Sequence, residues 1–153
     1  MAESQIVQVL NRHRRIALDT CVLVYYLERS ERFHAVADAV ISRVCQGRNE
    51  AVLSTLALLE TLVGPYRRQA DSVAETYYAA LSQLPHCQWA PLTYAIADRA
   101  AQLRGSHNLT TPDAIHVATA IESSAELFVT NDADLPEVPG IRYLQLIHFS
   151  PEG

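Results

Sequence analysis

Residues 14–28 read RRIALDTCVLVYYLE, and this stretch sets a pattern that the rest of the chain repeats. Its first part is a compact apolar run that ends at Asp19, which is typical of a buried strand with an acid at its C-terminal end. The part that follows, residues 21–28, is expected to be a short helix. A strand joined to a helix is the unit from which α/β domains are built.

The same alternation continues to the end of the chain. Four more apolar runs are expected to be strands, at residues 50–54, 87–92, 126–132 and 141–147. The spacing of apolar residues predicts helices over residues 31–47, 54–65, 68–83 and 93–105, and a loop followed by a helix over residues 107–123. We therefore expect an α/β fold with a central, mainly parallel sheet and helices on both of its faces.

Glycine, proline and threonine mark the expected helix ends. Gly47, the pair Gly64–Pro65 and Gly105 are expected to end three of the helices, because glycine tolerates the backbone conformation that follows a helix. Thr111 is expected to cap the helix near the end of the chain, with Pro112 at its first helical position.

The composition is that of an ordinary globular chain. Its 153 residues, 49% of them hydrophobic and 19% charged, are enough for one domain and too few for two of usual size. The three cysteines are widely spaced and form no CxxC pair, so neither a zinc site nor a disulfide framework is indicated, and a reducing cytoplasm is expected. No signal peptide and no apolar run long enough to span a membrane is recognised.

The charged residues exclude several classes of function. A net charge of −5 argues against a generic basic surface that coats nucleic acid. All twelve basic residues are arginine, and lysine is absent. Receiver domains, haloacid-dehalogenase-like phosphatases and Walker-loop proteins all depend on a lysine near the phosphate, so this chain matches none of them. A Ser-His-Asp hydrolase is disfavoured because the GxSxG motif is absent.

Four acids fall where a parallel sheet would bring them to one edge. Asp19 and Asp132 follow expected strands, Asp113 lies in the first turn of a helix, and Glu60 lies in the middle of another. Sites of α/β sheets lie at the carboxyl ends of the strands. Taken singly, these acids and Asp134 can be explained as helix caps, turn residues or solvated charges. Four such coincidences at one edge favour a functional site.

Glu60 is the least expected of the acids, because its helix is otherwise apolar. On a helical wheel it lies at the border of an arc that contains Leu58, Leu59, Leu62 and Val63, through which we expect the helix to pack. Clustered carboxylates repel one another unless a cation intervenes, and no lysine is available. We therefore expect a hard divalent ion, Mg²⁺ or Mn²⁺, in a pocket suited to hydrolysing a phosphodiester.

Four segments together resemble the PIN-domain ribonucleases of the VapC toxin type. They are IALDTCVLVYYLE, AVLSTLALLETLV, LTTPDAIHVATAI and ELFVTNDADL, and the resemblance covers about residues 14–147. It implies a three-layer PIN sandwich, with a single domain at residues 14–153 after an N-terminal extension at residues 1–13.

The resemblance also implies a metal site and a reaction. The acids that match the family's metal ligands are Asp19, Glu60, Asp113 and Asp132, with Asp134 able to share or replace the role of Asp132. They would hold Mg²⁺ or Mn²⁺ for endonucleolytic cleavage of RNA, and Thr130 and Asn131 would line the pocket. A complete set of acids implies an active enzyme. The alternative is a catalytically silent PIN-like module that binds RNA or a protein.

The same resemblance implies a cognate antitoxin whose C-terminal segment enters the acidic pocket, a homodimer, and a cytoplasmic protein without a membrane partner. Some further residues are more simply explained by structure. His116 is expected to be a packing residue, with a hydrogen bond to a group of the pocket as the alternative. Ser54 or Thr55 is expected to be a helix cap, and contact of Ser54 with the site is the alternative there. Single arginines such as Arg99 and Arg104 are expected to be solvated charges rather than contacts to RNA.

Overall fold

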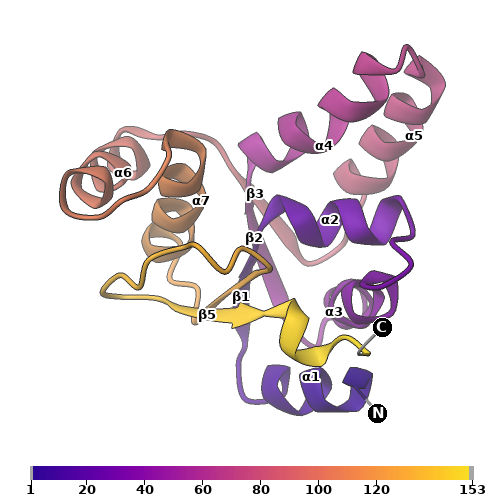
Figure 1. Cartoon of the computed structure of the whole chain (residues 1–153), viewed down its shortest axis with the longest axis horizontal. Helices are drawn as coiled ribbons and strands as arrows, with labels where there is room; N and C mark the ends of the chain where they lie inside the picture. Colours follow the sequence, from indigo (N-terminus) through magenta and orange to yellow (C-terminus); the bar gives the residue numbers. More distant parts are fainter. Residues whose placement is uncertain (1, 152–153) are drawn as a thin grey trace.

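The computed structural model describes residues 2–151, and at its centre lies a sheet of five parallel strands (Figure 1). The strands are β1 (Arg15–Leu18), β2 (Glu50–Ser54), β3 (Cys87–Ala90), β4 (Leu127–Thr130) and β5 (Arg142–Gln145). Their order across the sheet is β3-β2-β1-β4-β5, so the first strand of the chain is the central one. The predicted strands and their parallel arrangement are confirmed.

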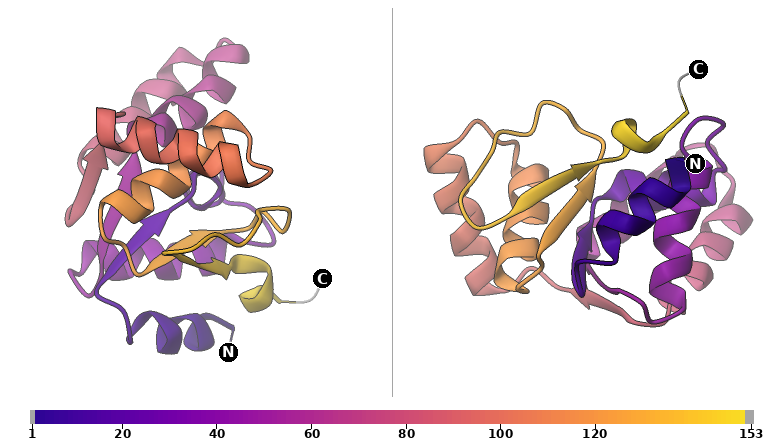
Figure 2. Two further views of the ribbon diagram at one scale, coloured as in Figure 1. Left: turned by 90° about the vertical axis from the view of Figure 1, so that its left-hand side faces the viewer. Right: turned by 90° about the horizontal axis from the view of Figure 1, so that it is seen from below.

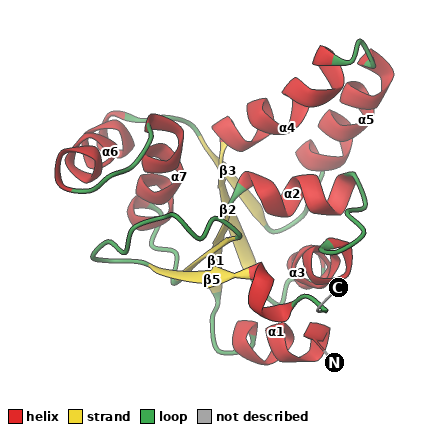
Figure 3. Ribbon diagram, viewed as in Figure 1, coloured by secondary structure: helices red, strands yellow, loops and turns green. Residues whose placement is uncertain are grey.

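Helices cover both faces of the sheet (Figure 3). They are α1 (Ala2–Leu10), α2 (Thr20–Leu27), α3 (His34–Cys45), α4 (Thr55–Arg67), α5 (Asp71–Ser82), α6 (Tyr94–Ser106) and α7 (Thr111–Glu122), and a 3₁₀ turn, η1 (Leu146–Phe149), follows β5. Helices α1 to α3 lie on one side of the sheet and α6 and α7 on the other, while α4 and α5 project beyond it on the side of α2 (Figure 1). This is the expected α/β sandwich of three layers.

The alternation of strand side chains divides the apolar core into two parts. Neighbouring residues of a strand point to opposite faces, so Ile16 and Leu18 pack with α2 and α3, while Ala17 and Phe128 pack with α6 and α7. Both faces of the sheet are thus buried, which explains why the strands are continuous apolar runs rather than alternating ones.

Helix α1 is packed into the core on the face that carries α3. Its side chains Ile6 and Leu10 are fully buried. Asn49 fixes its C-terminal end: Nδ2 donates to the carbonyl of Leu10 at 3.0 Å and to that of His13 at 2.6 Å, and Oδ1 accepts from Arg43 Nε at 2.7 Å. A single buried amide therefore ties α1 to α3 and to the start of β2.

The division of the chain at residue 13 stays a prediction. Met1 of the expected extension, and Glu152 and Gly153 of the expected domain, lie outside the described residues. Within residues 2–151, none of the helices has the length and apolar character needed to cross a bilayer.

Three of the predicted helix ends are wrong. Helix α4 continues through Gly64 and Pro65 to Arg67, because a glycine before proline has no Cβ to clash with the proline ring. Helix α6 continues one residue beyond Gly105, whose φ is not positive. Helix α7 is capped by Thr110, whose hydroxyl accepts from the backbone N–H of Asp113 at 3.3 Å, so Thr111 and Pro112 are its first two residues. By contrast, α3 ends as predicted, with Gly47 at φ +70°.

Replacing the buried amide of Asn49 should destabilise the fold. We expect Asn49→Ala to lower the free energy of unfolding by about 2–4 kcal/mol, because buried carbonyls and the Arg43 guanidinium lose their partner. Urea denaturation followed by circular dichroism measures the change. Thr76→Ala, which removes an exposed hydroxyl bond to Ser72 on α5, is the control and should change stability by about 0.5 kcal/mol or less. Equal stabilities for the two variants would contradict the assignment.

Candidate active site

Asp19 lies at the carboxyl end of the central strand, between β1 and α2. Its Oδ1 accepts from the backbone N–H of Thr20 at 2.8 Å, and its Oδ2 accepts from Thr130 Oγ1 at 2.7 Å. Burial raises the pKa of this carboxyl above its ordinary value, and the hydrogen bond from Thr130 opposes that rise. Asp19 is therefore both the N-cap of α2 and an acid held at the junction of two neighbouring strands.

Glu60 reaches the same region from α4. Its Oε1 accepts from Thr20 Oγ1 at 2.9 Å and lies 2.5 Å from His116 Nε2. An ionised carboxylate only accepts, so the proton of this contact is on Nε2. The hydrogen bond from His116 holds the pKa of Glu60 below its ordinary value, although partial burial works against it. His116 is buried, and of the two roles that the sequence left open it takes the hydrogen bond to a predicted site residue.

The predicted packing face of α4 is confirmed at Leu58, which packs against the apolar core, and is wrong at Leu59 and Val63. Its buried residues are Ala57, Thr61 and Pro65, which recur every four positions, while Leu59 and Val63 are 61% and 41% exposed. Small side chains let the helix approach its neighbours closely, so the buried face is set by size rather than by hydrophobicity. Thr61 also satisfies its own hydroxyl by donating to the carbonyl of Ala57 at 2.7 Å.

Asp113, Asp132 and Asp134 line one hollow of about 450 Å³ beside the start of α7. The charge of Asp113 contributes to the raised pKa of Asp19, so this hollow and the Asp19 carboxyl are electrostatically connected. Asp132 is partly a turn residue, because its Oδ1 accepts from the backbone N–H of Asp134 at 2.9 Å. Its own N–H donates to Thr130 Oγ1 at 3.2 Å.

The predicted acids thus form two neighbouring groups. Asp19 and Glu60 meet at Thr20, and the three aspartates share the hollow. In the part of the chain that the structure describes, no three Asp, Glu, His or Cys side chains come together closely enough to hold a metal ion by themselves. The donors are nevertheless all carboxylate oxygens, and burial raises the pKa of Asp19 despite the opposing effects of Thr130, His116 and Thr20. This chemistry fits an ion such as Mg²⁺, which keeps several of its waters.

Two residues beside the acids have roles that sequence reasoning missed. The backbone N–H of Thr20 donates to Asp19, and its hydroxyl donates to Glu60. The position of Thr20 directly after Asp19 is the sequence feature that could have indicated this role. Asn131, expected to line the pocket, instead links two elements, because Nδ2 donates to the hydroxyl of Tyr25 at 3.2 Å and Oδ1 accepts from the N–H of Ile147 at 2.8 Å. Ser54 is the cap of α4, as predicted for this position.

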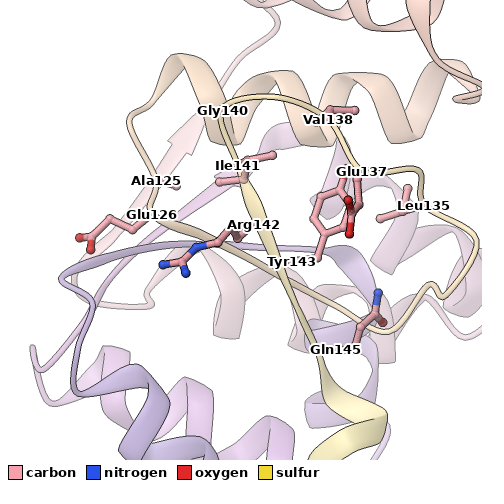
Figure 4. A pocket seen from close by; sticks show the side chains of 10 residues that line it. All are labelled: Ala125, Glu126, Leu135, Glu137, Val138, Gly140, Ile141, Arg142, Tyr143 and Gln145. Atoms are coloured by element: carbon pink, nitrogen blue, oxygen red, sulfur yellow. The ribbon is translucent and has the colours of Figure 1, made fainter.

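A larger hollow, of about 880 Å³, lies along β5 and the loop before it (Figure 4). Figure 4 shows Glu126 and Arg142 at its edge and Tyr143 within it. Tyr143 donates to the carbonyl of Pro136 at 2.8 Å, and burial raises its pKa to about 12. None of the five predicted acids lines this hollow. We therefore place the candidate active site at the smaller, acidic one.

The sequence model of the PIN domain family matches residues 16–141 of this chain. No significant match to a curated protein was found.

Solved structures of similar fold include two toxin–antitoxin assemblies and one toxin. A toxin–antitoxin complex from Klebsiella pneumoniae aligns with a TM-score of 0.62 at 23% identity, over 82% of this chain and 94% of that chain. VapBC2 from Rickettsia felis, bound to a DNA fragment from its promoter, aligns at 0.68 and 14% identity, over 86% and 98%. The sarcin-ricin loop cleaving toxin VapC20 from Mycobacterium tuberculosis aligns at 0.61 and 19%, over 78% and 91%. At these identities the similarity establishes the fold alone.

The contact between His116 and Glu60 can be tested by titration. In metal-free protein, we expect His116→Leu to raise the pKa of Glu60, because the largest stabilisation of the carboxylate is lost, and His116→Gln to raise it less, because an amide N–H can still donate. Carbon-13 NMR of the glutamate carboxyl groups measures both. Glu122, which pairs with Arg99 on the surface, is the internal control and should not change.

The same contact sets a pH dependence of stability. The pKa of Glu60 is lower in the folded chain than its ordinary 4.5, so the interaction stabilises the fold above that value and is lost as the pH falls through the folded pKa. The stability difference between wild type and His116→Leu should therefore shrink on acidification. A difference that grows below pH 4.5 would contradict this account.

Proposed function

The chain belongs to the PIN domain family, and from this membership we propose that it is a divalent-metal-dependent endoribonuclease and the toxin of a toxin–antitoxin pair. The observation that carries the proposal is the position of Asp19, a half-buried acid at the carboxyl end of the central strand, whose pKa is raised by desolvation and, to a smaller extent, by Asp113. The fold shared with the sarcin-ricin loop cleaving toxin VapC20 and with VapBC assemblies supports RNA as the substrate and an antitoxin as the partner.

Nucleases of this family generally use divalent metal ions. We propose that Asp19, Glu60, Asp113 and Asp132 hold Mg²⁺ or Mn²⁺, partly through water, with Asp134 as an alternative to Asp132. Such an ion, when bound, lowers the pKa of water and neutralises charge that develops on the phosphate. The division of the acids into two groups supports ligation in which waters complete the coordination sphere.

The chain's own residues position these acids. Both hydrogen bonds of Glu60 fall on Oε1, from Thr20 and His116, which leaves Oε2 to accept from a water in the site. Asp19 is oriented by Thr20 and Thr130, so its carboxylate needs no rearrangement when substrate arrives. A carboxylate of the site would accept the proton of the attacking water as the new bond to phosphorus forms in line with the leaving oxygen.

The proposal includes a cognate antitoxin, a homodimer and a cytoplasmic location, as the toxin–antitoxin pairing implies. A second candidate function is a silent PIN-like module that binds RNA or a protein without cutting it. The complete set of acids favours the enzyme, because clustered carboxylates repel one another unless a cation lies between them.

The Asp19 carboxylate should be essential for cleavage. We expect Asp19→Asn to reduce the cleavage rate of RNA by at least about a thousandfold with Mg²⁺ present, because the ion loses a charged ligand, while the circular dichroism spectrum is unchanged. End mapping of products from total RNA measures the activity, and a chelator should abolish it in wild type. Glu75→Gln on the exposed face of α5 serves as the control. Full activity of Asp19→Asn would exclude this mechanism.

Metal binding should depend on the acids of the hollow. Isothermal titration with Mn²⁺ should show binding to wild type and a loss of affinity of about tenfold or more in Asp113→Asn, because a charged ligand becomes neutral. Asp98→Asn on α6, whose carboxylate accepts from Gln102 at 2.8 Å, should bind as wild type does. Unchanged affinity in Asp113→Asn, together with RNA binding but no cleavage by wild type, would favour the silent module.

A further inference from the structure

Arg104 stands beside the acidic hollow without neutralising it. It lines the hollow together with Asp113, Asp132 and Asp134. Nevertheless, across residues 2–151 its guanidinium comes within 4.0 Å of no carboxylate oxygen. An arginine so placed keeps its charge available for another anion.

The guanidinium of Arg104 is fixed in place rather than free. Its Nε donates to the carbonyl of Leu109 at 3.0 Å and its Nη1 donates to Thr111 Oγ1 at 2.9 Å. Leu109 lies in the connection between α6 and α7, and Thr111 is the first residue of α7. The two helices pack side by side (Figure 2). These two bonds use only part of the arginine's donor fork. The guanidinium therefore lies at the N-terminal end of α7, whose first turn carries Asp113.

This arrangement is suited to a phosphate. A guanidinium binds a phosphate through paired N–H donors, and a side chain that is already ordered loses little entropy on binding. The acids of the hollow and the net charge of −5 repel a polyanion, so a strand that enters the site needs a local cation besides any metal. Arg104 is the arginine that lines the hollow.

We infer that Arg104 binds a backbone phosphate of the RNA strand beside the acidic hollow, an assignment that rests on the proposed ribonuclease function. It is a substrate-binding residue, which positions the strand across the acids and does not take part in the chemical step. The expectation from sequence that Arg104 is a solvated charge is then replaced by a specific role.

The kinetics of Arg104→Ala test this inference. With a single-stranded oligonucleotide that wild type cleaves, we expect KM to rise about tenfold to a hundredfold, as for loss of a charge-assisted hydrogen bond, and kcat to stay within about threefold. The slope of log KM against log salt should fall by about 0.7, the value for one phosphate contact to a single strand. Arg104→Lys should recover part of KM. Arg99→Ala, on the same helix but paired with Glu122 at 2.8 Å, is the control and should leave KM unchanged.

Mn²⁺ binding separates this role from a structural one. If Arg104 only clamps the loop before α7, Arg104→Ala would displace Asp113 and weaken Mn²⁺ binding along with kcat. If it binds phosphate, Mn²⁺ affinity should be kept or slightly increased, because a nearby positive charge is removed. Loss of Mn²⁺ binding, an unchanged KM, or an equal effect of Arg99→Ala would each overturn the inference.

The two proposals can fail separately. Wild type that cleaves RNA while Arg104→Ala keeps the same KM would refute the phosphate contact and leave the ribonuclease in place. Wild type that does not cleave RNA would refute the ribonuclease. Fluorescence anisotropy of a labelled single-stranded RNA on wild type and on Arg104→Ala then decides the contact, which requires weaker binding by the variant.

Discussion

The hydrogen bond from Thr130 Oγ1 to Asp19 Oδ2, 2.7 Å long, is the contact around which the site is arranged. It joins the carboxyl ends of β1 and β4, which the sheet already places side by side through the bond from Asp19 N to the carbonyl of Val129. Glu60 is connected to this contact through Thr20, whose hydroxyl donates to it. Asp132 is connected through its backbone N–H, which donates to the same Thr130 hydroxyl. Acids from three separate elements are thereby ordered relative to one central strand.

Asp19 and Glu60 both accept a hydrogen bond from Thr20, but their pKa values are shifted in opposite directions. Desolvation raises the pKa of Asp19, and the hydrogen bonds from Thr130 and Thr20 offset that rise only in part. The pKa of Glu60 is lowered because His116 and Thr20 donate to it, and these bonds outweigh the opposing effect of its partial burial. A cation bound between them would therefore stabilise the charge of Asp19 most, whereas Glu60 is already ionised and oriented before a cation arrives.

Sequence patterns succeeded where the cause is local and failed where it depends on a neighbour. The strand at residues 50–54 follows from an apolar run, and the end of α3 at Gly47 follows from the backbone conformation that glycine allows. Both causes can be recognised in the sequence directly. The residues through which α4 packs cannot be recognised from the sequence in this way. A helical wheel favours Leu59 and Val63, yet the surrounding elements accept Ala57 and Thr61, whose small side chains allow close approach. Hydrophobicity indicates what can be buried, and only the shape of the neighbours decides what is.

The sequence by itself determined the order of strands and helices and the position of each acid within them. Continuous apolar runs make buried parallel strands, and such strands bring the residues that follow them to one edge of the sheet. Only the tertiary structure decided the partners of those acids. His116 meets Glu60 across 56 residues, and Thr130 meets Asp19 across 111. Hydrogen bonds act over about 3 Å, so contacts between such distant residues exist only once the helices have packed against the sheet.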